Sequence, residues 1–175
     1  MSISIESQYK KALEKHLNIE IELQSLPCGY ISKKVIHGKT QYYLQRRSGK
    51  KIIGKYIPDD EVKTVEKKLS KRDSLEFKLA TVNARISELE AAAKLIDSTL
   101  YNKLLLLKAC MPMDRLSADE RQKASSFATA MNAVEGVYAS EETQNAVGAW
   151  IAGEASFLSV YERTLKKYGF PVEVR

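Results

Sequence analysis

The feature that most restricts the fold is a long apolar stripe in a segment without helix-breaking residues. No glycine or proline occurs between Pro58 and Pro112. Apolar residues recur there in steps of three and four, as on one face of an α-helix. They are Leu79, Val82, Ile86, Leu89, Ala93, Ile96, Leu100, Leu104 and Leu107, with Val62, Val65 and Leu69 in the same phase upstream. The pattern predicts one coiled-coil-like helix of about 50 residues, about 75 Å long.

A helix of this length cannot bury its stripe by itself. It must pair with an N-terminal helix, fold back on itself, or form a coiled coil in a homodimer. Residues from about Ser4 to Gln24 supply the N-terminal helix, which Pro27 ends because proline disfavours helical geometry in the residue before it. Core packing explains the stripe without any cofactor.

Between these helices the sequence predicts a small antiparallel sheet. β-branched and aromatic runs at 30–36, 40–46 and 50–57 alternate with glycine-containing turns, which is typical of a three-stranded meander. From Gly29 to Ile57 there are eight basic residues and no acidic one. The basic residues are Lys33, Lys34, Lys39, Arg46, Arg47, Lys50, Lys51 and Lys55, and they interleave with Tyr30, Tyr42, Tyr43 and Tyr56.

This basic meander has two interpretations. It can bind DNA or another nucleic acid, because lysine and arginine neutralise phosphates while bases stack on tyrosine rings. It can also be a solvated sheet whose lysines discourage edge-to-edge pairing. The run Leu26-Pro27-Cys28-Gly29-Tyr30-Ile31-Ser32, with Gly38-Lys39 and Tyr42-Tyr43-Leu44-Gln45, resembles a hairpin-plus-coil domain found in uncharacterised bacterial and phage proteins. That resemblance covers residues 26–89 and implies a fold but no function.

The clearest predicted boundary is at Met111-Pro112, which separates residues 1–111 from residues 112–175. In the second part, Ser117 and Glu120 form a capping box at the start of a helix that Gly136 ends in a left-handed conformation. Two more short helices, which begin at Ser140 and Ser156, complete a small three-helix bundle centred on Trp150. The predicted fold class is therefore α+β, mostly α.

Glu135 has an unusual position in this bundle. It lies in the last turn of the helix, where a carboxylate opposes the helix dipole at a cost of about 0.3–1 kcal/mol. It also borders the apolar face made by Ala124, Phe127, Ala128, Met131 and Val134. A glutamate before a terminal glycine is also common in helices where it has no functional role. If the position is functional, it predicts contact with a molecule outside the chain.

The run Met131-Asn132-Ala133-Val134-Glu135-Gly136 resembles the inhibitory helix of VbhA-type antitoxins, which silence Fic-domain AMP-transferases. The pattern of that family is Ser or Thr, three variable residues, Glu, and then Gly or Asn. The similarity continues in Ser140-Glu141-Glu142 and in the run from Trp150 to Ser156, so it covers roughly residues 117–170. Met131 departs from the pattern, because the family has a hydroxyl side chain there.

The resemblance implies an antitoxin of a toxin–antitoxin system that regulates AMPylation. Its last three helices would dock on a Fic-domain protein. Glu135 would pair with an arginine of that enzyme's ATP-binding motif and prevent productive placement of the γ-phosphate. Gly136, Met131 and Phe127 complete this expected partner-inhibition site. The alternative is a nucleic-acid-binding or scaffolding protein organised by the basic meander and the long helix.

Nothing in the sequence indicates catalysis. Its two histidines and two cysteines lie in unlike contexts and form no metal-type pair, and there is no Gly-rich phosphate loop. We therefore expect neither enzymatic activity nor a cofactor. No apolar run approaches the roughly 20 residues that span a bilayer, and the first six residues lack a signal-peptide pattern. A cytoplasmic protein without membrane contact is the expectation.

Overall fold

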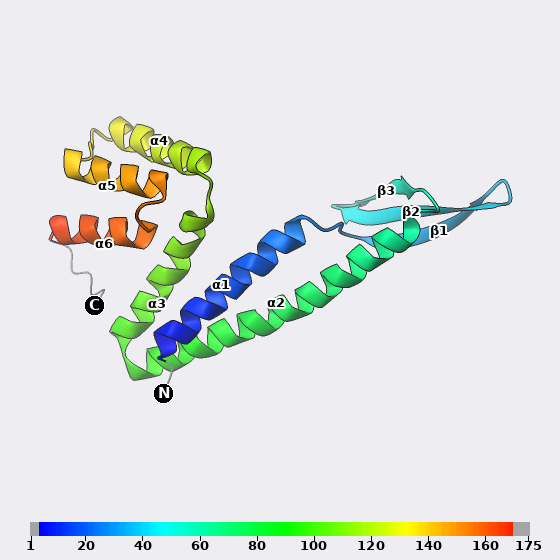
Figure 1. Ribbon diagram of the computed structural model, residues 1–175, viewed down its shortest axis with the longest axis horizontal. Coiled ribbons are helices and arrows are strands. Elements are labelled where there is room, and N and C mark those ends of the chain that lie inside the picture. Colours follow the sequence, from blue (N-terminus) through cyan, green and yellow to red (C-terminus); the bar gives the residue numbers. More distant parts are fainter. Residues whose placement is uncertain (1–3, 170–175) are drawn as a thin grey trace. The chain divides into compact units, whose positions relative to one another are not determined.

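A helix, a three-stranded sheet and a series of helices follow one another along the chain, and this mostly α, α+β order confirms the predicted fold class (Figure 1). The computed structural model describes residues 4–169. Contacts divide the chain into two units, the described parts of residues 1–13 and 86–175, and residues 14–85. The boundary expected at Met111-Pro112 lies inside the first of these units, and a domain division there stays a prediction.

The elements, in chain order, are α1 (Ile5–Gln24), β1 (Tyr30–Ile36), β2 (Lys39–Ser48), β3 (Lys51–Ile57), α2 (Val62–Ile96), α3 (Ser98–Cys110), the 3-10 helix η1 (Met111–Arg115), α4 (Ala118–Val134), α5 (Glu141–Ala152) and α6 (Phe157–Lys167). Among residues 4–169, no helix combines the length and the apolar character that crossing a membrane requires.

The single helix expected between Pro58 and Pro112 is in fact two helices, so the predicted length of about 50 residues was wrong. After α2 ends, Asp97 adopts an extended conformation with φ −161° and ψ 128°. Its carboxylate accepts hydrogen bonds from the N–H groups of Thr99 and Leu100, at 3.0 and 3.2 Å. Asp97 is therefore the N-cap of a new helix. α3 folds back along α2, where Lys108 Nζ lies 2.9 Å from Glu90 Oε1.

The predicted stripe is buried within one chain. In the first unit, Tyr9 and Leu13 of α1 join the stripe residues of α2 and α3 in the core. The stripe residues there are Ile86, Leu89, Ala93, Leu104 and Leu107, none more than 6% exposed. Ile96 is 65% exposed, because α2 ends at that residue. Pairing with the first helix and folding back are thus both realised, while the homodimer stays a prediction.

In the second unit, Arg72 has a specific role although it is a charged residue that interrupts the apolar stripe between Leu69 and Leu79. Its Nη1 donates hydrogen bonds to the carbonyl oxygens of Leu23 and Leu26, at 3.1 and 3.2 Å. These carbonyls lie at the end of α1, where helical partners run out. Nearby, His16 Nδ1 lies 2.8 Å from Asn83 Oδ1, and Lys71 pairs with Glu22. These bonds hold the second half of α1 against α2 (Figure 1).

The sheet is a meander in the order β1-β2-β3, with antiparallel pairing throughout. Gly29 leads into β1 at φ +128°, and a Cβ on it would come within 2.1 Å of the Gln45 carbonyl oxygen. Only glycine allows this close approach of the entering chain to β2. At the other end of the sheet, Ile57 and Val62 are 4% and 8% exposed and join β3 to the start of α2.

Candidate functional site

The helix that carries Glu135 starts with the predicted capping box. Ser117 Oγ accepts the N–H of Glu120 at 3.4 Å, and the Glu120 carboxylate accepts from the N–H and hydroxyl of Ser117 at 2.8 and 2.7 Å. These hydrogen bonds to the ionised form lower the pKa of Glu120 below its ordinary value. The start of α4 is therefore fixed by local sequence alone.

Trp150 is the centre of the C-terminal bundle, as the sequence predicts. Its side chain is 2% exposed. The Phe157 ring packs against it with ring centroids 4.9 Å apart, and the Arg121 guanidinium lies 5.7 Å from the indole centroid. The indole therefore joins α4, α5 and α6 in one core.

Two polar residues that sequence reasoning missed hold this bundle together. The same oxygen of Asp114, Oδ1, accepts from Trp150 Nε1 at 3.2 Å and from the N–H of Phe157 at 2.7 Å. Arg121 donates to the carbonyl oxygens of Trp150 and Asp114 at 2.7 and 2.6 Å. Its buried Nε has no hydrogen-bond partner among the described residues. Together these bonds connect η1 to α4, α5 and α6.

The end of α4 has the geometry that its sequence predicts. Gly136 takes φ +73°, and the N–H of Val137 closes the turn on the carbonyl oxygen of Asn132 at 2.9 Å. Glu135 is the C-cap, with φ −87° and ψ 2°. Its side chain is exposed and makes no hydrogen bond or ion pair with any residue of 4–169. A free carboxylate thus stands at the negative end of the helix dipole.

Only the first half of α4 packs on the bundle. Arg121, Ala124 and Ser125 are partly buried, whereas residues 126–132 are exposed all round the helix. The predicted apolar face is therefore uncovered: Phe127 is 70%, Met131 52% and Val134 85% exposed. Beyond Gly136, Val137 and Tyr138 are also exposed, at 56% and 75%. We call Phe127, Met131 and Val134 the α4 strip; it ends beside Glu135.

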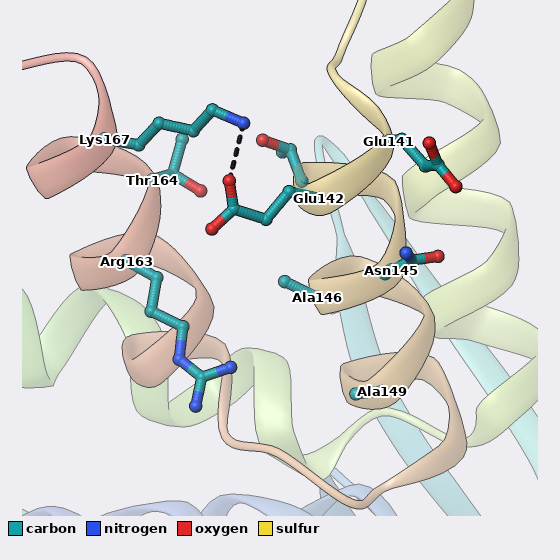
Figure 2. A pocket seen from close by; sticks show the side chains of 9 residues that line it. Glu141, Glu142, Asn145, Ala146, Ala149, Arg163, Thr164 and Lys167 are labelled. Carbon is teal, nitrogen blue, oxygen red and sulfur yellow. Dashed lines mark hydrogen bonds and ion pairs between the residues drawn. The ribbon is translucent and has the colours of Figure 1, made fainter.

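A hollow of about 470 Å³ lies between α5 and α6 (Figure 2). Lys167 Nζ crosses it, donating to Glu142 Oε2 at 2.7 Å and to Ser140 Oγ at 2.6 Å. Lys167 lowers the pKa of the Glu142 carboxyl through this hydrogen bond and its charge. Lysine and glutamate therefore satisfy each other across the hollow. No group of three or more His, Cys, Asp or Glu within residues 4–169 is placed to hold a metal.

The structure divides the basic residues of the meander between the two faces of the sheet. Side chains alternate along a strand, and cross-strand partners share a face. The pairings Lys33↔Tyr42, Arg46↔Ile53 and Leu44↔Lys55 define one face. Lys34↔Gln41, Ile36↔Lys39 and Arg47↔Ile52 define the other. Lys33, Arg46, Lys51 and Lys55 thus lie on the first face, Lys34, Lys39 and Arg47 on the second, and Lys50 in the turn.

The first face meets the end of α1, whereas Lys39, Gln41 and Tyr56 of the second face line a separate hollow with Val62, Lys63 and Glu66 at the start of α2. The hollow between the sheet and the end of α1 is lined from the sheet by Leu44, Arg46, Ile53 and Lys55, all on that face, and from α2 by Arg72. The second face carries Tyr30, Tyr43 and Tyr56, one on each strand. We call it the tyrosine face.

One family model, described as a domain of unknown function (DUF6788), matches residues 5–67. The chain is similar to that family from α1 through the sheet to the first turns of α2. The match overlaps the segment 26–89 that resembles an uncharacterised hairpin-plus-coil domain. No curated protein and no solved structure matches the chain.

Proposed function

We propose that the chain is an antitoxin-type inhibitor that binds a Fic-domain AMP-transferase and blocks its ATP site with Glu135. One structural observation carries the proposal: an unpaired carboxylate stands at the end of a helix whose residues 126–132 are exposed all round. This is the stretch that resembles the inhibitory helix of VbhA-type antitoxins. A half-helix with an apolar strip and no internal cover is typical of a segment that packs on a partner.

The α4 strip supplies the expected anchor. Phe127, Met131 and Val134 recur at i, i+4 and i+7, so they form one continuous line. Apolar and aromatic side chains that become buried at the centre of an interface carry most of its binding energy. Met131 lacks the hydroxyl that the antitoxin pattern has at this position. Its contribution here is therefore packing.

The end of α4 favours a cation. The last carbonyl oxygens of a helix are negatively polarised, so an arginine placed near Glu135 meets both the carboxylate and the helix dipole. A carboxylate–arginine pair forms charge-assisted hydrogen bonds, worth about 1.5–3 kcal/mol. Gly136 turns the chain directly after Glu135, whose side chain is exposed. Glu135 would therefore hold the partner's arginine away from the ATP γ-phosphate.

The test requires a Fic-domain protein whose gene lies next to the gene of this chain. Such a protein is identified by the sequence motif His-Pro-Phe-x-Asp/Glu-Gly-Asn-Gly-Arg. The two proteins are co-purified, and AMP incorporation from labelled ATP is measured. Glu135→Gly should leave the complex intact and release AMP transfer, while Glu154→Gln, which changes an exposed acid beyond α5, should stay silent. The proposal fails if the Glu135→Gly complex remains bound and remains inactive.

A further inference from the structure

The tyrosine face has one ring on each of its three strands. Tyr43 and Tyr56 are cross-strand partners, with ring centroids 5.8 Å apart at an interplanar angle of 71°. Tyr30 of β1 pairs with Gln45, which lies two residues beyond Tyr43 on β2. Tyr30 and Tyr56 are 55% and 50% exposed, although large aromatic side chains contribute most when buried. Two exposed rings, on β1 and β3, therefore lie on either side of the half-buried Tyr43 ring on β2.

Glutamine side chains fix two of these rings. Tyr43 Oη donates to Gln41 Oε1 at 2.7 Å, and Tyr30 Oη donates to Gln45 Oε1 at 3.0 Å. The hydroxyls are thus partnered within the sheet. What the rings still offer to a ligand is their apolar faces, together with the N–H groups of the glutamine amides.

The charged side chains that the sheet itself places on this face are all basic, while Asp59 and Glu66 line a hollow beside Lys39 and Tyr56 at one end. Lys34, Lys39 and Arg47 lie on it, and Lys34 Nζ is 5.2 Å from the Tyr43 ring centroid. No acidic residue occurs from Gly29 to Ile57. A ligand that complements the face must therefore be both anionic and able to stack on aromatic rings.

We propose that the tyrosine face binds single-stranded nucleic acid, with unpaired bases stacked on Tyr30, Tyr43 and Tyr56 and with phosphates on Lys34, Lys39 and Arg47. Stacking on aromatic rings beside a basic track is how proteins bind single strands without reading sequence. A duplex fits poorly, because its bases are already stacked and would leave the tyrosine rings against the sugar–phosphate backbone. The proposal does not rest on the inhibitory role of Glu135.

The first test measures binding of the full chain by fluorescence anisotropy. The labelled probes are poly-dT and poly-U of about 12 nucleotides and a duplex of equal length. We expect either single strand to bind more tightly than the duplex, and the dT and U arms to show whether the 2′-hydroxyl matters. Three phosphate contacts predict a slope of log K against log salt of about −2. Tyr30→Leu and Tyr56→Leu should each weaken binding about tenfold.

The second test exploits neighbouring residues on opposite faces. The double variant Lys34→Gln/Arg47→Gln removes two charges from the tyrosine face, whereas Lys33→Gln/Arg46→Gln removes two from the other face of the same strands. The first variant should lose about tenfold more affinity than the second. Circular dichroism must show that both stay folded; because all four side chains are exposed, neither change should unfold the sheet. Equal losses, equal affinity for the duplex, or no binding of either single strand would overturn the proposal.

Discussion

Trp150 Nε1 donates a hydrogen bond across 3.2 Å to Asp114 Oδ1, and the same oxygen accepts the N–H of Phe157. One carboxylate therefore connects η1 to the core tryptophan and to the first turn of α6. At that turn the N–H groups of a helix lack partners and the dipole favours a negative charge. Asp114 provides both a hydrogen-bond acceptor and a negative charge at this turn. It therefore fixes η1 to α5 and α6 in the bundle that also contains α4.

Asp114→Ala should destabilise this bundle by about 2–4 kcal/mol, because it leaves the buried indole N–H and a helix N–H without acceptors. Trp150 is the only tryptophan in the sequence, so its emission reports on the bundle directly. Chemical unfolding followed by tryptophan emission measures the loss. Asp119→Ala is the control, since Asp119 pairs with Lys123 at the surface and is 74% exposed. A similar loss for both variants would contradict the role of Asp114.

The core formed by the stripe can be tested with one substitution at two places on α2. Leu89 is 4% exposed and Leu95 is 89% exposed. Leu89→Asp should cost several kcal/mol, because an unpaired charge would be buried, whereas Leu95→Asp should change stability by less than about 0.5 kcal/mol. Thermal unfolding followed by circular dichroism measures both. Sedimentation of the wild-type chain tests the coiled-coil homodimer separately, and a monomer would exclude that arrangement.

Tyr9 and Glu90 give the first unit a pH dependence. Tyr9 Oη donates to Glu90 Oε1 at 2.5 Å, and Lys108 Nζ lies 2.9 Å from the same oxygen. Burial opposes ionisation of Glu90, but these two hydrogen bonds outweigh it and hold the pKa of the carboxyl below its ordinary 4.5. Burial and the hydrogen bond to Glu90 raise the pKa of Tyr9 far above its ordinary range. The network therefore requires an ionised Glu90 and a neutral Tyr9.

Because the pKa of Glu90 is lower in the folded state, its contribution to stability is present above about pH 4.5 and is lost as the pH falls through the folded value. Tyr9→Phe should cost about 1.5–3 kcal/mol at neutral pH, since Tyr9 is fully buried and its partner is charged. The difference from wild type should shrink in acid, when Glu90 is protonated. Urea unfolding at neutral and acidic pH measures it. A difference that does not change with pH would contradict the network.

Elements whose signals are local were predictable from the sequence. Ser117, Ser140 and Ser156 cap their helices, and Gly136 and Gly153 end theirs in the left-handed region, because each signal depends on neighbours within about four residues. Asp97 carried a local signal too, an acid followed by Ser98 and Thr99. Helical spacing continues across it, so periodicity alone hides the break between α2 and α3.

The polar network of the bundle was not predictable in this way. Arg121 bonds to Trp150, 29 residues further along the chain, and Asp114 bonds to Trp150 and Phe157, 36 and 43 residues further along. Such contacts exist only once the helices have packed. The faces of the sheet depend on register in the same way, because a shift of one residue would move Lys34 and Arg47 to the opposite side. Alternation along each strand separates Lys33 from Lys34 and Arg46 from Arg47, but only the register shows which of them share a face.

The α4 strip gives the sharpest separation of binding from inhibition. Phe127→Asp should abolish binding to the Fic-domain protein, because a charge would replace the aromatic anchor of the interface. Stability and Trp150 emission should not change, since Phe127 is 70% exposed and lies outside the packed half of α4. Thr129→Asp introduces the same charge on another side of α4 and should still bind. Pull-down of the Fic-domain protein measures both variants.

Met131 completes this test. Met131→Ala should reduce inhibition only slightly, because its side chain is expected to pack and not to hydrogen-bond. Met131→Ser restores the hydroxyl of the antitoxin pattern and should inhibit AMP incorporation at least as well as Met131→Ala, by adding a hydrogen bond worth about 0.5–1.5 kcal/mol. If Phe127→Asp still binds, α4 does not dock through this strip, and if Met131→Ala releases the enzyme as fully as Glu135→Gly, Met131 does more than pack.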